Sequence, residues 1–113
     1  MRFQPKVEST SFGKVIYYGD DKTLRFALYY YSDDLEDLYL SNVFVNPKFR
    51  QKGYGDKILD FAFKFAKQHN FSQLFLNVSK NSWVKQWYQS RGFIPIEDCG
   101  KDYPGNIWMK ANV

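Results

Sequence analysis

The stretch Asn46-Pro47-Lys48-Phe49-Arg50-Gln51-Lys52-Gly53-Tyr54-Gly55-Asp56 joins an apolar run to an amphipathic run through two closely spaced glycines. This pattern predicts a strand, a tight turn and a helix. Glycines at positions 53 and 55 let the backbone turn sharply and approach a ligand, and the first amides of a helix lack intrahelical partners. Arg50, Lys52 and Lys57 add positive charge at the same end. The stretch therefore favours a phosphorylated, nucleotide-like ligand.

Size and composition predict one small folded domain over residues 1–113. The chain is 44% hydrophobic and 20% aromatic, which argues against disorder. No apolar run approaches the roughly 20 residues of a membrane helix, and the N-terminus lacks the apolar segment of a signal peptide. We therefore expect a cytoplasmic protein that does not contact a membrane. One cysteine and one histidine provide no metal-ligand cluster, so no metal is expected.

The chain before the glycine stretch predicts three strands. Residues 11–18 and 23–31 are β-branched and aromatic runs separated by the turn 19–22, which indicates a hairpin. The acidic segment 32–37 is expected to be a solvated turn. Residues 38–45 form a nearly continuous apolar run, which predicts a strand in the middle of a sheet, covered on both faces.

The chain after the glycine stretch predicts two helices and three strands. Apolar residues recur at helical spacing from residue 56 to about 70, and residues 74–78 return as a strand, which predicts a right-handed parallel crossover. A second helix follows, capped by Asn81 or Ser82 and ending at Gly92, and the last strands are expected at 93–96 and 106–110. The predicted fold class is α/β (α+β), with a mixed, mostly antiparallel central sheet, a parallel strand-helix-strand crossover and two principal helices.

Two separate motifs resemble the GNAT superfamily of N-acyltransferases. The first is the Arg/Gln-x-x-Gly-x-Gly/Ala signature, present as residues 50–55 after a strand ending at residue 45. The second is a later segment with Asn81, Val84, Trp87-Tyr88 and Gly92-Phe93. Both motifs occur in order, and the resemblance covers roughly residues 11 to 110. It implies a GNAT-like fold and the use of acetyl-CoA, or another acyl-CoA, as co-substrate.

The resemblance also implies which residues hold acetyl-CoA. The backbone amides of the signature would hold the pyrophosphate, the preceding strand would pair with the pantetheine arm, and Asn81 would contact that arm. Tyr88 matches the family's tyrosine that protonates the departing thiolate, so it is the expected general acid. The implied cofactor-binding residues are Val43, Phe44, Val45, Arg50, Gln51, Lys52, Gly53, Tyr54, Gly55, Asp56, Asn81 and Tyr88.

Two positions near this site depart from the family pattern. Many members use a glutamate on the central strand as general base, and the matching position is Tyr39. Asp37 and Ser41 should share its face by strand alternation, so either could act through an ordered water, with Asp37 ranked first. Asp56 stands where the family often has Ser or Thr, which would place a carboxylate beside the phosphates.

A third departure is the short N-terminus. Family members usually begin with a strand and two helices that roof the acceptor site, and about ten residues precede the first predicted strand here. We expect an open acceptor groove that suits a peptide, a protein or another macromolecular amine, or a groove closed by a second subunit in a homodimer.

These observations predict an N-acetyltransferase that moves the acetyl group of acetyl-CoA to a primary amine of a small molecule or protein by direct attack. Two alternatives stay open. One is a catalytically silent CoA-binding or interaction module, which the missing carboxylate at position 39 supports. The other, less favoured, is a small nucleic-acid-binding domain, because the net charge of +4 accompanies many aromatic residues.

Overall fold

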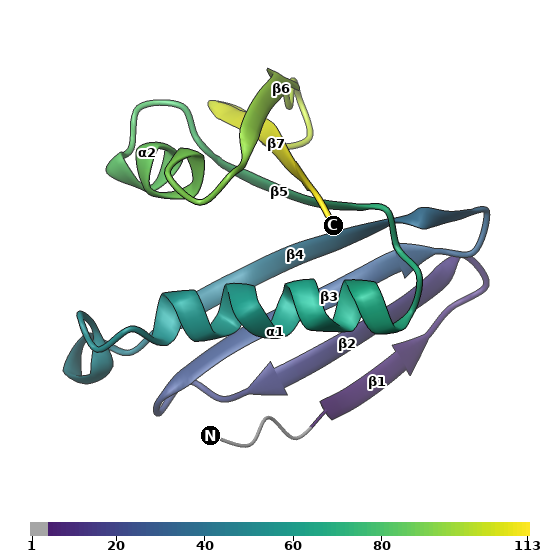
Figure 1. The fold of residues 1–113 in the computed structure, drawn as a ribbon, viewed down its shortest axis with the longest axis horizontal. Coiled ribbons are helices and arrows are strands. Elements are labelled where there is room, and N and C mark those ends of the chain that lie inside the picture. The colour runs from purple at the N-terminus through teal and green to yellow at the C-terminus, as the bar shows by residue number, and fades with distance from the viewer. Residues whose placement is uncertain (1–4) are drawn as a thin grey trace.

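A seven-stranded sheet organises the protein, and the computed structural model describes residues 5–113 (Figure 1). The strands lie in the order β1-β2-β3-β4-β5-β7-β6, with β4 and β5 parallel and the other neighbours antiparallel. This confirms the predicted mixed sheet and its two principal helices. The elements are β1 (Pro5–Ser9), β2 (Gly13–Gly19), β3 (Leu24–Tyr31), β4 (Asp34–Val45), a 3₁₀ turn (Pro47–Phe49), α1 (Tyr54–Gln68), β5 (Gln73–Ser79), α2 (Trp83–Gln89), β6 (Ile94–Asp98) and β7 (Asn106–Asn112).

The N-terminal edge of the sheet contains a strand that the sequence reading missed. β1 pairs with β2 along its whole length, and residues 10–12 turn the chain between them. The Thr10 hydroxyl accepts hydrogen bonds from the amides of Phe12 and Gly13, which holds this turn. The short connection between β1 and β2 contains no helix.

β4 is longer than predicted, because the acidic segment expected as a turn begins the strand. Asp34 already pairs with Tyr31, so Ser32 and Asp33 alone form the turn. Asp37 pairs with Gln73 of β5 on the other side. The backbone of this segment is held by both neighbouring strands, and that pairing overrides the low strand propensity of aspartate and glutamate.

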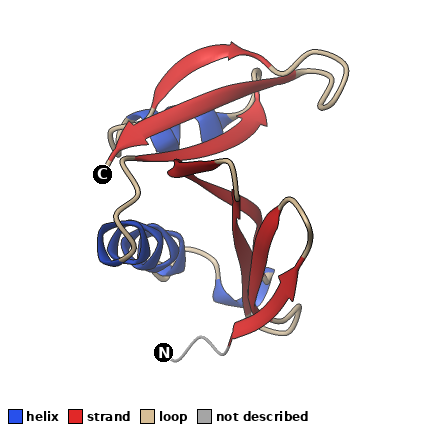
Figure 2. Ribbon diagram, turned by 90° about the vertical axis from the view of Figure 1, so that its right-hand side faces the viewer, coloured by secondary structure: helices blue, strands red, loops and turns tan. Residues whose placement is uncertain are grey.

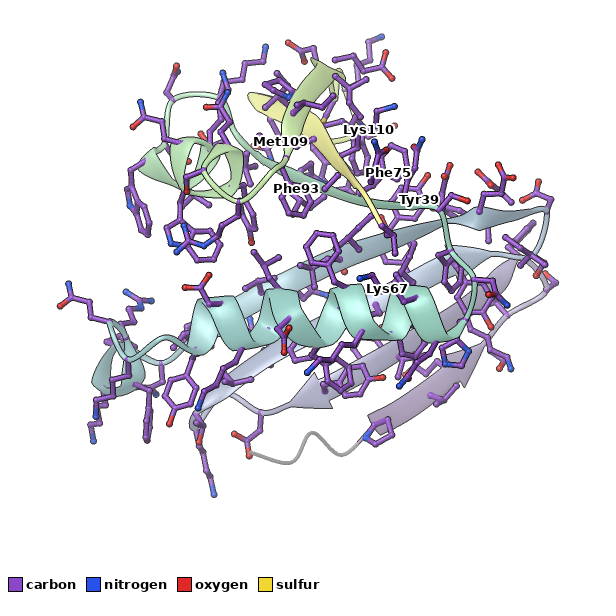
Figure 3. The ribbon with its side chains drawn as sticks, in the orientation of Figure 1. Tyr39, Lys67, Phe75, Phe93, Met109 and Lys110 are labelled. Atoms are coloured by element: carbon purple, nitrogen blue, oxygen red, sulfur yellow. The ribbon has the colours of Figure 1, made fainter. Side chains whose placement is uncertain are left out.

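Both helices lie on one face of the sheet, here called the helix face. Figure 2 shows α1 along the β1–β4 half and α2 behind the β5-β7-β6 half. Phe93, just before β6, joins the two helices, since its ring contacts Phe63 of α1 and Tyr88 of α2. Figure 3 labels Phe93 and Met109 within this core. The fully buried side chains include Leu24, Phe26, Leu28, Leu38, Ile58, Leu74, Phe93 and Met109.

The opposite face, here called the open face, has no helix over it in the part of the chain that the structure describes. Leu38 and Leu40 of β4 are buried on the helix face, whereas Tyr39 and Ser41 on the open face are half-buried. The prediction that this strand is covered on both faces was therefore wrong for the open face. Aromatic side chains cover that face in place of a helix.

No helix within residues 5–113 combines the length and the apolar character needed to cross a membrane. The cytoplasmic location stays a prediction.

Candidate functional site

A groove opens on the helix face where β4 and β5 separate. Their parallel pairing ends at Tyr39–Phe75, two residues labelled in Figure 3, yet the strands continue to Val45 and Ser79. Figure 1 shows the strands diverging toward the end of the sheet where α1 begins. The space between them has a volume of about 480 Å³. This helix-side groove is lined by residues that include Ser41, Asn42, Val43, Phe44, Val45, Arg50, Gly55, Asn77, Val84, Trp87 and Tyr88.

A β-bulge in β4 lies at the start of this separation. Ser41 pairs with Ala27 of β3, and the next pair is Phe44 with Arg25. Two residues of β4 therefore oppose one residue of β3, and the first of them, Asn42, has a φ of 54°. Asparagine tolerates this left-handed conformation better than the apolar residues around it. Because a bulge bends its strand, it helps to direct β4 away from β5.

The loop before α1 leaves a row of backbone amides available to an anion. Gln51 has a φ of 62° and Gly53 a φ of 80°, and α1 begins at the next residue without a side-chain cap. Within residues 5–113, no backbone carbonyl accepts a hydrogen bond from the amides of residues 51–56. The Lys52 ammonium lies 5.6 Å from the Phe49 ring, and the Lys57 ammonium lies 5.2 Å from the Tyr54 ring. Positive charge and open amides therefore coincide at one helix end, as an anion requires.

The carboxylate of Asp56 is paired with Arg91 rather than left beside this anion site. The Arg91 Nε lies 2.5 Å from Oδ1 of Asp56, and Nη2 lies 3.0 Å from Oδ2. The hydrogen bond from Arg91 lowers the pKa of the Asp56 carboxyl. The same guanidinium stacks 3.7 Å from the Trp87 ring, which also contacts Gly55. Arg91, just after α2, thus pairs with the acidic residue in the first turn of α1.

Tyr88 is the buried phenol of the helix-side groove. Its side chain is 7% exposed, and its ring packs edge-on against Phe93 with centroids 5.4 Å apart. Burial raises the pKa of the Tyr88 hydroxyl to about 12. This hydroxyl makes no hydrogen bond to another described residue. Tyr88 therefore carries its proton at neutral pH and has it available for a ligand in the groove.

A second cavity, also about 480 Å³, lies on the open face. It shares Leu40, Ser41, Asn42 and Asn77 with the helix-side groove, so the two cavities meet between the separated strands. The side-chain oxygen of Asn77 accepts a 2.8 Å hydrogen bond from the side-chain nitrogen of Asn106. This bond orients the Asn77 side chain at the junction. This open-face cavity is lined by residues that include Thr10, Phe12, Val15, Tyr29, Tyr31, Ser41, Asn42, Asn77 and Tyr103.

Comparison with known proteins identifies the family of this chain. The family model of the acetyltransferase (GNAT) domain matches residues 12–95. The chain belongs to the GNAT acetyltransferase family. A search of curated protein sequences finds no match.

Solved GNAT structures share the fold along most of this chain. A GNAT family acetyltransferase from Elizabethkingia anophelis with acetyl-CoA bound has a TM-score of 0.74 and 18% identity, over 99% of this chain and 97% of its own. ElaA from Escherichia coli has a TM-score of 0.67 and 20% identity, over 88% and 68%. N-acetylglutamate synthase from Neisseria gonorrhoeae, complexed with coenzyme A and N-acetyl-glutamate, has a TM-score of 0.70 and 18% identity, over 87% and 25%. At these identities the likeness establishes the fold.

Tyr39, which was predicted to occupy the position of the GNAT general base, is part of an aromatic ladder. Its ring stacks on Tyr29 at 4.8 Å and on Phe75 at 5.3 Å, and Tyr31 and Trp108 contact it edge-on. Aromatic pairs of this kind each contribute about 1 kcal/mol beyond area burial. The side chain at position 39 therefore ties β3, β4 and β5 together.

Asp37 and Ser41 share the open face with Tyr39, but they lie at different distances from the junction. Ser41 lines both cavities, whereas Asp37 lines neither. Four strand residues separate the two, which corresponds to about 13 Å. Burial, followed by a hydrogen bond and repulsion from Asp34, raises the pKa of the Asp37 carboxyl to about 6.

The remaining predicted site residues divide into two groups. The strand residues 43–45, Arg50, Gly55 and Tyr88 line the helix-side groove. The loop residues 51–53 with Tyr54 and Asp56 form the adjoining turn and helix start. Asn81 is exposed in the turn before α2 and is not among the lining residues of the groove.

Three residues contribute to the site without having been predicted from the sequence: Asn42, Asn77 and Arg91. An asparagine inside an apolar strand was the available signal for the bulge at Asn42. Asn77 and Arg91 had no comparable signal, because their roles depend on strand separation and on a contact between two helices.

Proposed function

We propose that this GNAT protein transfers the acetyl group of acetyl-CoA to a primary amine of a small molecule or protein. The observation that carries the proposal is the junction of the two cavities at Ser41, Asn42 and Asn77. One cavity adjoins an anion-binding helix start, and the other opens on the opposite face of the sheet. Two reactants can therefore enter from opposite faces of the sheet and meet between the separated strands. Direct transfer requires that the two reactants meet in this way.

The residues of the helix-side groove fit the parts of acetyl-CoA. The free amides of residues 51–56, with Arg50, Lys52 and Lys57, suit the pyrophosphate. The edge of β4 beyond Tyr39 has lost β5 as its neighbour, so its backbone is available to the amides of the pantetheine arm. Residues 43–45 lie on this edge.

Tyr88 is the proposed general acid. An acceptor nitrogen attacks the thioester carbonyl, the carbon–sulfur bond breaks, and Tyr88 protonates the departing thiolate. Its burial in the groove keeps the phenol protonated until that step. Of the two residues predicted to act as base through an ordered water, Ser41 lies at the junction, where its weakly basic hydroxyl can orient a water or the acceptor nitrogen but does not take its proton. Asp37 would act through waters across about 13 Å of strand.

A second candidate function is a silent CoA-binding module. Tyr39 favours it, because the ring at the usual base position is held by four aromatic neighbours and has no proton-accepting role at neutral pH. Such a module would bind acetyl-CoA without transferring the acetyl group.

Two measurements test the proposal. Calorimetric titration with acetyl-CoA should give saturable binding, and thiol release with an amine panel should follow for wild type and fall in Tyr88→Phe. Saturable binding without thiol release for any amine would favour the silent module, and absence of binding would exclude both. The homodimer stays a prediction, and sedimentation velocity would test it by measuring the mass of the protein in solution.

A further inference from the structure

We propose that the acceptor is an arylamine, an amine whose nitrogen is bonded directly to an aromatic ring. This inference rests on the proposed function and assigns a substrate class to the open-face cavity. It follows from the lining of that cavity and from the separation between the junction and Asp37, the carboxylate predicted as general base.

The side chains that face the open-face cavity are aromatic or uncharged. Tyr29 and Tyr31 come from β3, with ring centroids 5.9 Å apart, Tyr103 comes from the loop between β6 and β7, and Phe12 comes from the β1–β2 turn. Tyr31 and Tyr103 are 44% and 45% exposed, and Phe12 is 75% exposed, so their rings are available to a ligand. Such a surface favours a flat aromatic ligand, because offset and edge-on ring contacts add to area burial.

One charged residue lines this cavity, and its side chain belongs to the other face. Lys14 pairs with Tyr30, and the Tyr30 ring packs on Phe71 on the helix face. Paired residues of antiparallel strands share a face, so the Lys14 side chain also lies there. No carboxylate or histidine is present among the described residues that line the cavity.

Neither of the two cavities that meet at the junction is lined by a carboxylate or histidine among the described residues. Asp20 and Asp21 line a separate cavity that also includes Asn42, but both are exposed, and Asp21 is paired with Arg25.

The titratable side chains that line the open-face cavity and lie on the open face are the phenols of Tyr29, Tyr31 and Tyr103, and burial raises the pKa of Tyr29 above its ordinary value. Beyond the cavity, Asp37 on β4 interacts with Lys110 on β7 and lies about 13 Å along the strand from Ser41. An alkylamine enters as an ammonium ion and needs such a base. An arylamine enters neutral, because its lone pair is delocalised into the ring.

The transfer balances without an external base. The neutral nitrogen attacks the carbonyl carbon, a carbon–nitrogen bond forms, and the carbon–sulfur bond then breaks. The thiolate takes the proton of Tyr88. The nitrogen, now acidic, releases one proton through solvent to the Tyr88 phenolate, so the products are the N-aryl acetamide and the free thiol.

Aniline and benzylamine make a matched pair of acceptors, because they differ by one methylene group. Thiol release from acetyl-CoA should give a kcat/KM at least roughly tenfold higher for aniline at pH 7, and that value should stay flat through the neutral range. The kcat/KM for benzylamine should increase as the pH rises toward the pKa of its ammonium ion. Equal or faster turnover of benzylamine at pH 7 would overturn the inference and leave the proposed acetyltransferase function standing.

Variants of the cavity rim give an independent measurement. Tyr31→Ala should raise the KM for aniline by about fivefold while the KM for acetyl-CoA is unchanged, and Phe12→Ala should act in the same direction. Tyr17→Ala is the control, because Tyr17 is an exposed tyrosine on the same face outside the cavity. Equal effects of all three substitutions would overturn the inference. Binding of acetyl-CoA without turnover of any amine would overturn it as well, and absence of binding would remove the proposed function itself.

Discussion

The two cavities that meet between β4 and β5 differ in how they are built. The helix-side groove adjoins a cationic loop of free backbone amides, and its elements follow one another along the chain. The open-face cavity is formed by neutral aromatic side chains from three distant segments. Backbone amides and charge suit a common phosphorylated donor, whereas side chains on a sheet face can vary freely. In the proposed function, the helix-side groove is therefore a general donor site, and the open-face cavity is the acceptor site in which specificity is set.

The largest expected effect is on the chemistry inside the helix-side groove. Tyr88→Phe should lower kcat about 100-fold, because the thiolate loses its proton donor, while the acetyl-CoA Kd stays within about twofold. Steady-state thiol release and calorimetry measure the two quantities. A fall in kcat of less than about threefold would mean that solvent protonates the thiolate.

A matched pair of glycine substitutions separates backbone strain from donor binding. Gly53 and Gly105 have φ angles of 80° and 81°, and an added Cβ would meet no atom at either site. Alanine at each should cost about 1 kcal/mol of unfolding free energy, because φ is positive. Gly53→Ala alone should raise the acetyl-CoA Kd, by about tenfold, since it disturbs the amides that suit the pyrophosphate. Equal Kd values for both variants would place the phosphates elsewhere.

The ion pair between Asp56 and Arg91 should modulate the donor site less strongly. Arg91→Gln leaves the Asp56 carboxylate unpaired at the anion site, so the acetyl-CoA Kd should rise about fivefold. The double variant with Asp56→Asn should recover most of the loss, because the repelling charge is gone. Calorimetric Kd values for the wild type, the two single variants and the double variant give the coupling free energy between Asp56 and Arg91. A double variant that binds acetyl-CoA no more tightly than Arg91→Gln would contradict this account.

The smallest expected effect is that of Asp37, near the start of β4 on the open face, on the stability of the protein. The pKa of Asp37 is raised from 3.8 to about 6, so the folded protein binds a proton that the unfolded chain has released in this range. The free energy of unfolding therefore falls as pH rises from about 4 to 6, and it stays at the lower value above pH 6. Asp37→Asn should raise the Tm by about 2 °C at pH 7, after allowance for solvent screening, and leave it unchanged near pH 4. Thermal melts at both pH values test this sign.

The parts of the molecule that follow from local sequence were predicted well. The glycine turn, α1 and the parallel return through β5 depend on backbone freedom and periodicity, which neighbouring residues determine. The strand at residues 34–37 was missed, because pairing with β3 and β5 outweighs its acidic composition. The pairing of Asp56 with Arg91 joins residues 35 positions apart, and no local pattern predicts it.

The bulge at Asn42 makes β4 more sensitive to changes in length than to changes in side chain. Side chains alternate between faces with a period of two, and the extra residue reverses the alternation beyond it. Phe44 therefore lies on the open face beside Arg25, and Val45 packs toward the core beside Leu24. Deletion of one residue between Ser41 and Phe44 would exchange these two faces. In directed evolution of this protein, the exposed positions of β4 should accept substitutions, whereas the strand as a whole should reject insertions and deletions.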